Sequence, residues 1–365
     1  MAPIPAPYAL AGVTTVREMW GRPVHHEWRE KIRSSALLGP PLGGRQPHRR
    51  RLALSVGGRR GSDHRGARRG RARCTVRQVK REGADFVKVY SRLSRETYFA
   101  IADGTVSGHP PSRGHCPDTV PIAEASAAGQ RTIEHLHALL LATSRHEKEI
   151  RRLLAAVRID PREVHPSNGG RCRATTGTGR TPSRAEEWKY LPAWQVESWP
   201  DQLAALNGGR TPEQRRQIRR IFAHRLHLVR ELHGAGVRLA AGTDTGTGYL
   251  VPGFALHDEL ALLVAAGLTP AEVLRVATRD AARTLGLPAV GTVARGQAAD
   301  LLVLDADPLR DIRNTRRIHG VVVNGRWLPT GGSPPTARGV EEAAAQAQPP
   351  QEGSTMRGCG CGGHP

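Results

Sequence analysis

Apolar and polar residues along the chain form blocks with a regular period, separated by blocks that lack one. The patterned blocks run over about residues 8–42, 76–156 and 186–328. Residues 43–75 and 157–185 are rich in Arg, Gly and Pro and show no period of 2 or 3.6. Periodic blocks predict packed helices and strands, whereas the two interruptions predict loops. The low-complexity tail 329–365 predicts disorder.

The third patterned block contains two complete signals for a helix start. Thr211-Pro-Glu-Gln214 offers a hydroxyl cap, a proline at the first helical position and a glutamine three residues after the cap. Apolar residues then recur at steps of three and four up to Gly234, which predicts a helix with one apolar face. A second capping box, Thr269-Pro-Ala-Glu272, predicts a helix that Gly286 ends.

Between these helices, residues 237–241 predict a short strand that ends at the turn Gly242-Thr-Asp-Thr245. A further helix is predicted over 256–264. Helix, strand and helix joined by short links are typical of a parallel sheet wrapped by helices, so the fold class is α/β.

Composition narrows the possible classes. A chain of 365 residues accommodates one large α/β domain and a small accessory one. The sequence has no apolar run of the roughly 18 residues that a membrane span needs, so we expect a cytoplasmic protein without a membrane partner. The 5 cysteines show no framework spacing, which predicts reduced thiols.

About half of the net charge of +21 lies in residues 45–75, which hold eleven Arg against one Asp. That arm contains no aromatic residue, whereas proteins that bind single-stranded nucleic acid combine charge with stacking rings. A solvated basic loop is therefore favoured over a nucleic-acid partner.

Four polar residues follow or interrupt predicted strands. Lys88 lies in the otherwise apolar run 85–90, His115 and His135 lie in Gly-His-Cys-Pro and Glu-His-Leu segments, and Asp244 lies in the glycine-rich turn. In a parallel barrel the active site forms where strands end, so these are the candidate functional residues. Taken singly, each is also typical of a structural residue.

In series, the motifs resemble the amidohydrolase superfamily, in its imidazolonepropionase-like and prolidase-like branch. The segments that carry the resemblance are 11–17, 83–90, the two histidine motifs, 236–245, 268–274, 291–305 and 322–325. The resemblance implies a metal-dependent hydrolase built as a (β/α)8 TIM-type barrel over 8–285, with a small C-terminal β-sandwich segment over 286–328.

The resemblance also assigns roles. Lys88 is expected to be carboxylated and to bridge two divalent metals, usually zinc, with His115 and His135 as ligands of the second metal and Asp244 as ligand of the first. A metal-activated hydroxide would then attack a small-molecule substrate, a cyclic amide, amide or dipeptide-like compound, and Asp244 would carry the proton to the leaving nitrogen. His257 either faces this substrate or lies on a solvated helix surface.

The sequence departs from the family pattern at one important place. The family's His-x-His pair, expected before Ala11, is absent, so we expect an incomplete barrel, one or two bound ions with one site incomplete, and unpaired sandwich strands that favour self-association. We interpret the chain as truncated and frame-disturbed, which leaves its present activity open. The alternatives are a catalytically inactive scaffold that contacts nucleic acid through 45–75, and a partial barrel completed by a separate chain.

Overall fold

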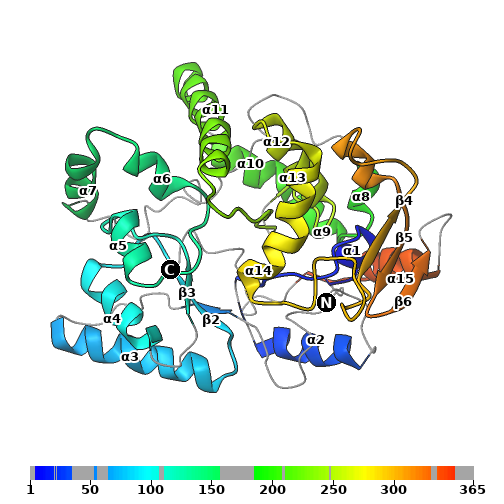
Figure 1. The fold of residues 1–365 in the computed structure, drawn as a ribbon, viewed down its shortest axis with the longest axis horizontal. Coiled ribbons are helices and arrows are strands. Elements are labelled where there is room, and N and C mark those ends of the chain that lie inside the picture. The colour runs from blue at the N-terminus through cyan, green and yellow to red at the C-terminus, as the bar shows by residue number, and fades with distance from the viewer. Residues whose placement is uncertain are drawn as a thin grey trace. The chain divides into compact units, whose positions relative to one another are not determined.

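The computed structural model describes residues 5–19, 21, 23–34, 53–55, 65–106, 111–156, 185–207, 210–245, 248–329 and 335–349. The chain divides into two compact units, each with its own sheet (Figure 1). Each unit also has its own apolar core. The parallel-sheet unit comprises Thr15–Glu30 and Leu42–Ile159. The antiparallel-sheet unit comprises Met1–Thr14, Lys31–Pro41 and Asp160–Pro365.

The parallel-sheet unit alternates strands and helices. Its elements are β1 (Ala53–Ser55), α3 (Arg65–Arg81), β2 (Phe86–Val89), α4 (Arg95–Val106), β3 (Ser112–Gly114), α5 (Ile122–Ala127), α6 (His137–Ala142) and α7 (Glu147–Ala156), and α2 (Pro23–Arg33) crosses the boundary between the units. The strands pair in parallel in the order β1-β2-β3. All four residues of β2 are buried, as expected for a parallel strand covered on both faces. The predicted α/β class is thus present in this unit.

Helix α3 corrects the prediction that residues 43–75 lack regular structure. Its first eleven residues, 65–75, belong to that segment and are helical. Arginine favours a helix, and the buried residues Ala72, Val76 and Val79 recur at helical spacing and pack in one core with Tyr98 and Ile101 of α4. These few apolar residues at helical spacing are enough to anchor the helix. They are hard to recognise in the sequence because Arg and Gly dominate the segment.

The antiparallel-sheet unit is mainly helical. Its elements are α1 (Pro5–Leu10), α8 (Ala185–Trp188), α9 (Ala193–Glu197), α10 (Trp199–Asn207), α11 (Pro212–Gly234), α12 (Ala255–Ala265), α13 (Pro270–Arg275), the π-helix η3 (Val276–Asp280), α14 (Ala281–Leu285), β4 (Leu301–Leu304), the 3-10 helix η4 (Ile312–Arg316), β5 (Ile318–Val323), β6 (Arg326–Pro329) and α15 (Pro335–Ala345). Both predicted capping boxes are formed, at Thr211 with Gln214 and at Thr269 with Glu272. Gly286 ends α14 in the left-handed conformation, as predicted.

Strands β4, β5 and β6 form an antiparallel sheet, and most of it lies within 286–328, where the sequence predicts a small β-sandwich segment. Val321, Val323 and Leu328 lie in one buried cluster with Ala9 of α1, so the helix covers this face of the sheet. Val303 and Trp327 are 39% and 49% exposed.

The strand predicted over 237–241 is wrong. These residues are described and have no regular secondary structure, and Val237 is 46% exposed. A strand requires a neighbour that pairs with its amides and carbonyls. In the part of the chain that the structure describes, no strand pairs with this segment.

The tail predicted to be disordered contains α15, whose Val340 and Ala344 are buried. Val340 packs with Ala6 and Leu10 of α1. The other unpatterned residues, apart from β1 and a few positions beside described elements, lie outside the described residues; they are 43–52, 56–64, 157–184, 330–334 and 350–365. Among the helices that are described, none is long and apolar enough to cross a membrane.

Candidate functional site

Lys88 lies at the centre of the parallel sheet, with only 1% of its surface exposed. Strand β2 pairs with β3, and Val89 stands opposite Gly114. At Gly114, φ is +117°, and a Cβ there would lie 2.5 Å from the Val89 carbonyl oxygen and 3.4 Å from the Lys88 Cγ. Glycine therefore allows the ends of β2 and β3 to approach each other beside the lysine side chain.

His115 follows β3 directly and is 8% exposed. Its Nδ1 lies 2.7 Å from the Ser91 hydroxyl, and its ring meets the Tyr90 ring edge-on at 5.1 Å between centroids. The Lys88 ammonium lies 4.7 Å from the centre of the same Tyr90 ring. Tyr90 thus connects the buried lysine to the first histidine.

His135 reaches the same place from the next segment. Gly114 forms a parallel bridge with Ile133, and the chain then turns so that the His135 and His115 rings lie 4.7 Å apart, with their planes at 89°. His135 has φ = +67° and Leu136 has φ = +59°. Non-glycine residues rarely adopt this left-handed conformation, and such strain is concentrated at functional sites.

A half-buried ion pair holds the turn that precedes His135. Arg17 contacts Glu134 at 2.9 Å and Thr132 at 3.1 Å, and the Thr132 hydroxyl donates to Glu134 at 2.7 Å. Burial acts to raise the pKa of Glu134, but Arg17 and Thr132 outweigh it and hold this pKa below its ordinary value. The carboxylate is therefore ionised beside His135 at neutral pH.

Cys116, the neighbour of His115, does not contribute a reactive thiolate. Its side chain is 6% exposed and donates to the Val120 carbonyl at 3.2 Å. Burial is the main cause that raises the pKa of Cys116 to about 11. The thiol is therefore protonated at neutral pH, and a protonated thiol is a weak nucleophile.

Asp244 belongs to the antiparallel-sheet unit and is half-buried. Its φ of +49° places it, like His135, in the left-handed region. The next side chain, Thr245, lies 2.5 Å from the Tyr8 hydroxyl. Two residues earlier, the Gly242 amide donates to the carboxylate of Glu259 in α12.

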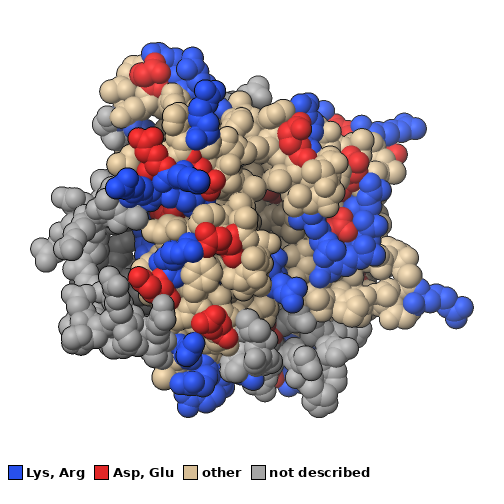
Figure 2. All heavy atoms as spheres, turned by 60° about the vertical axis from the view of Figure 1, so that its left-hand side comes forward, with Lys and Arg blue, Asp and Glu red and all other residues tan. Residues whose placement is uncertain are grey.

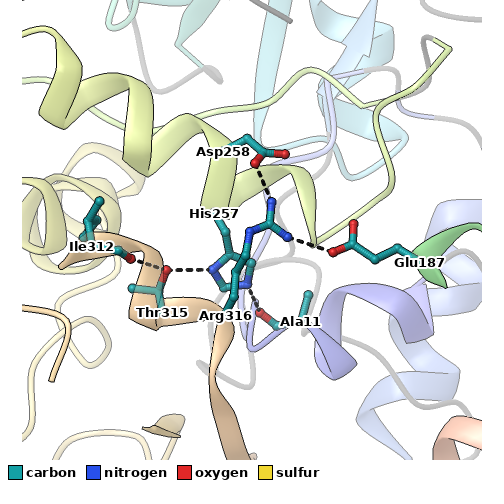
Figure 3. A network of polar contacts seen from close by, with 7 residues as sticks. All are labelled: Ala11, Glu187, His257, Asp258, Ile312, Thr315 and Arg316. Carbon is teal, nitrogen blue, oxygen red and sulfur yellow. Dashed lines mark hydrogen bonds and ion pairs between the residues drawn. The ribbon is translucent and has the colours of Figure 1, made fainter. Parts of the chain in front are cut away.

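His257 is 4% exposed within α12, and both of its ring nitrogens have partners (Figure 3). Nε2 lies 3.1 Å from the Ala11 carbonyl and Nδ1 lies 3.0 Å from the Thr315 hydroxyl. Beside it, Arg316 bridges Asp258 at 2.5 Å and Glu187 at 2.8 Å. His257 is thus part of the internal frame of the unit, and its expected role toward substrate stays a prediction.

The described residues contain no group of three or more His, Cys, Asp and Glu side chains that could hold a metal ion. The structure nevertheless brings Lys88, His115 and His135 to one edge of the parallel sheet. Imidazole nitrogens suit zinc and related divalent metals, so the chemistry of these donors fits such an ion. Because Ser91 engages Nδ1 of His115, a metal held by this residue would be ligated through Nε2.

The sequence analysis missed several residues that contact candidate functional residues or their turns. Ser91 carries a recognisable signal, because a polar residue directly after a buried strand lies at the functional edge of a parallel sheet. Glu259 and Tyr8 carry no local signal. Tyr8 and Thr245 are 237 positions apart, and only the folded chain brings them together.

Residues 203–328 match the family model described as Amidohydrolase family. An imidazolonepropionase of Deinococcus deserti is 44% identical over 87 residues, which cover 24% of this chain and 22% of that protein. An ochratoxinase of Aspergillus niger is 38% identical over 82 residues, covering 22% of this chain and 16% of that protein. The matched segment therefore spans about a quarter or less of either relative.

Solved structures extend the likeness to most of the chain. A bottromycin amidohydrolase has a TM-score of 0.66 at 23% identity, over 94% of this chain and 77% of that one. A putative prolidase from Bifidobacterium longum has a TM-score of 0.57 at 26% identity, over 94% and 80%. These neighbours have the barrel-type amidohydrolase fold. Over residues 203–328 the chain thus belongs to the amidohydrolase family, and it is similar to an imidazolonepropionase and to a putative prolidase.

Proposed function

We propose that this chain is a metal-dependent hydrolase that cleaves a C–N bond in a small cyclic amide, amide or dipeptide-like substrate. The observation that carries the proposal is the convergence of Lys88, His115 and His135 at the ends of neighbouring parallel segments. A lysine that is 1% exposed is rare in a protein core unless a partner compensates its charge, and a carbamate that binds a metal would provide such compensation. Membership of the superfamily supports the same reading.

Each side chain has a proposed task. Lys88 would react with carbon dioxide as a neutral amine to form a carbamate, which is a ligand like a carboxylate. His115 and His135 would supply imidazole nitrogens, with the His115 ring held by Ser91. A bound divalent metal such as zinc supplies Lewis-acid activation of water and of the substrate carbonyl.

Asp244 would act as the proton carrier. A carboxylate accepts the proton of an attacking water and returns it to the departing nitrogen, which otherwise leaves as an unstable amide anion. The left-handed backbone at Asp244 supports a functional role, because a conformation that costs free energy is retained where the geometry of a side chain matters.

The alternative, an inactive scaffold that contacts nucleic acid, has less support. Most of the basic arm 45–75 lies outside the described residues or has undescribed side chains. On the face in Figure 2, acidic side chains lie among the basic ones. Exposed arginines of the parallel-sheet unit pair with acids, as Arg73 does with Asp103 and Arg95 with Glu124. Loss of nucleic-acid affinity with rising salt would support this alternative.

The test combines metal content with hydrolysis by the full-length protein. Purified protein is analysed for zinc and then assayed with a Gly-Pro dipeptide, N-acetylmethionine and hydantoin, each with added zinc and bicarbonate. We expect at least one zinc per chain and hydrolysis of at least one probe. We expect Lys88→Ala to lose both properties and Lys189→Ala, at a half-exposed lysine paired with Glu341, to retain them.

A signal from 13C-labelled bicarbonate in the carbamate region of the carbon spectrum, absent from Lys88→Ala, tests the modified lysine without an activity assay. A folded protein that binds no zinc and hydrolyses none of the probes contradicts the proposal.

A further inference from the structure

The turn that carries Asp244 is not an independent loop. Asp244 has φ = +49°, a conformation in which an aspartate is less stable than a glycine. A turn under such strain persists only when surrounding contacts favour it over relaxed alternatives. The described neighbours of Asp244 supply two such contacts, one on each side of the aspartate.

On the C-terminal side, the Thr245 hydroxyl lies 2.5 Å from the hydroxyl of Tyr8 in α1. Both groups are half-buried, and either oxygen can be the donor. A hydrogen bond that joins a turn to a helix from the far end of the chain restricts the turn strongly, because it fixes the Thr245 side chain and, through it, the backbone.

On the N-terminal side, the backbone amide of Gly242 donates to the carboxylate of Glu259 in α12. An amide fixed two residues before Asp244 restricts the rotation of the peptide units that lead into the left-handed residue. The two contacts thus hold positions 242 and 245, with Asp244 between them.

Helices α1 and α12 can restrain the turn because they are tied to each other. Gly253, just before α12, has φ = +80°, and a Cβ there would lie 2.7 Å from the Cα of Tyr8. Nε2 of His257 bonds the Ala11 carbonyl just after α1, as Figure 3 shows. Tyr8 and Glu259 therefore project from one connected frame.

We propose that Tyr8 and Glu259 are positioning residues that hold the Asp244 turn in its left-handed conformation and so fix the direction of the Asp244 carboxylate. The inference rests on the proposed function for the catalytic importance of Asp244. The conformational part, the restraint of the turn, stands on the 2.5 Å contact between the Tyr8 and Thr245 hydroxyls, and the contact of Glu259 with the Gly242 amide supports it. Neither residue is expected to contact substrate.

The test uses the full-length protein in two measurements. The first is hydrogen–deuterium exchange of the peptide that spans 240–246, followed by mass spectrometry. We expect Tyr8→Phe, Thr245→Val and Glu259→Ala each to accelerate this exchange about threefold or more, because each removes a restraint. Thr245→Ser and Glu259→Gln keep an acceptor for the hydrogen bond and should exchange at the rate of the parent protein.

Tyr249→Phe is the matched control. Its ring lies in the same loop, against Trp188 and Trp199, and the substitution removes a tyrosine hydroxyl other than the one at Thr245. We expect its exchange over 240–246 to match the parent. The double variant Tyr8→Phe with Thr245→Val should exchange no faster than either single variant, since both remove one bond.

The second measurement is hydrolysis of whichever probe the parent protein cleaves. We expect Tyr8→Phe to lower kcat about tenfold and to leave KM unchanged, because a misdirected proton carrier slows chemistry rather than binding. Unchanged exchange in both Tyr8→Phe and Thr245→Val overturns the inference. Accelerated exchange in a protein without any hydrolysis keeps the restraint and rejects the proposed function, so the two failures are distinguishable.

Discussion

The rings of His115 and His135 meet edge to face, with centroids 4.7 Å apart and planes at 89°. They come from segments joined by the parallel bridge between Gly114 and Ile133. Two imidazoles at this separation, beside a buried lysine, form a compact set of nitrogen donors at one edge of a sheet. The arrangement predicts how zinc affinity responds to substitution.

We expect His115→Ala and His135→Asn to weaken zinc binding about 10- to 100-fold each, because each removes a nitrogen donor. Asparagine is chosen at position 135 because it tolerates the left-handed conformation better than alanine. Competition with a chromogenic chelator measures the affinity. His319→Ala is the matched control, since this exposed histidine bonds Asp305 on the other unit's sheet. Equal weakening in the control would show that the effect is not specific to the site.

The left-handed backbone at His135 and Asp244 predicts an unusual order of stability. At either position, glycine should make the protein about 1 kcal/mol more stable than alanine, because glycine adopts φ near +60° without steric cost. Urea unfolding of the four variants measures the difference. At Ala223, an exposed position within α11, the order should reverse by about the same amount, since glycine disfavours a helix interior. If glycine and alanine rank in the same order of stability at positions 135, 244 and 223, the backbone at His135 and Asp244 is not strained.

Local signals in the sequence were sufficient to predict where α11 and α13 begin. A cap and its partner lie three residues apart, as Thr269 and Glu272 do, so one short motif fixes where α13 begins. The candidate site residues were predicted differently, from the unusual position of Lys88 within an apolar strand and from the resemblance to the family.

The features that the sequence could not predict depend on residues that are distant in the chain. Residues 237–241 have the apolar composition of a strand, but a strand forms only where a second strand pairs with it, and the sequence of the segment does not show whether one does.

The same reason explains why Tyr8, Glu259 and the partners of His257 escaped detection. His257 was expected to face either substrate or solvent, because its helix position alone allows both. Burial against Ala11 and Thr315 depends on segments 246 and 58 positions away. Disorder was predicted for α15 from composition, although Val340 finds a core supplied by α1.

The buried hydroxyl of Thr315 predicts a large loss of stability on its removal. It donates to the Ile312 carbonyl at 2.8 Å and contacts Nδ1 of His257 at 3.0 Å, and the residue is 2% exposed. Thr315→Val preserves the shape but removes a partner from two buried polar groups, which we expect to cost about 1–3 kcal/mol. Thermal and urea unfolding measure the change.

Thr278→Val provides the comparison for Thr315. The Thr278 hydroxyl also donates to a carbonyl, that of Leu274 at 2.7 Å, but it is exposed and water replaces it. A loss of about 0.5 kcal/mol or less is expected there. Similar losses in both variants would mean that burial of the His257–Thr315 contact contributes nothing specific.

Glu259 predicts a pH dependence of stability. Burial raises the pKa of Glu259 to about 7 from an ordinary 4.5, against the opposing effect of the Gly242 amide. The folded state therefore binds a proton more tightly than the unfolded state does. The stabilisation is fully present below pH 4.5, declines as the pH rises to 7 and is lost above that.

Glu259→Gln isolates this contribution, because the amide has nearly the same shape and cannot ionise. The free energy of unfolding of Glu259→Gln minus that of the parent should grow by about 1–3 kcal/mol between pH 5 and pH 8. Urea unfolding at pH 5, 6, 7 and 8 gives this difference directly. Glu342→Gln, at an exposed glutamate of α15, should give a difference that does not change with pH. If the difference for Glu259→Gln is equally flat, the carboxyl is ionised in the folded protein throughout this range and its burial does not control its protonation.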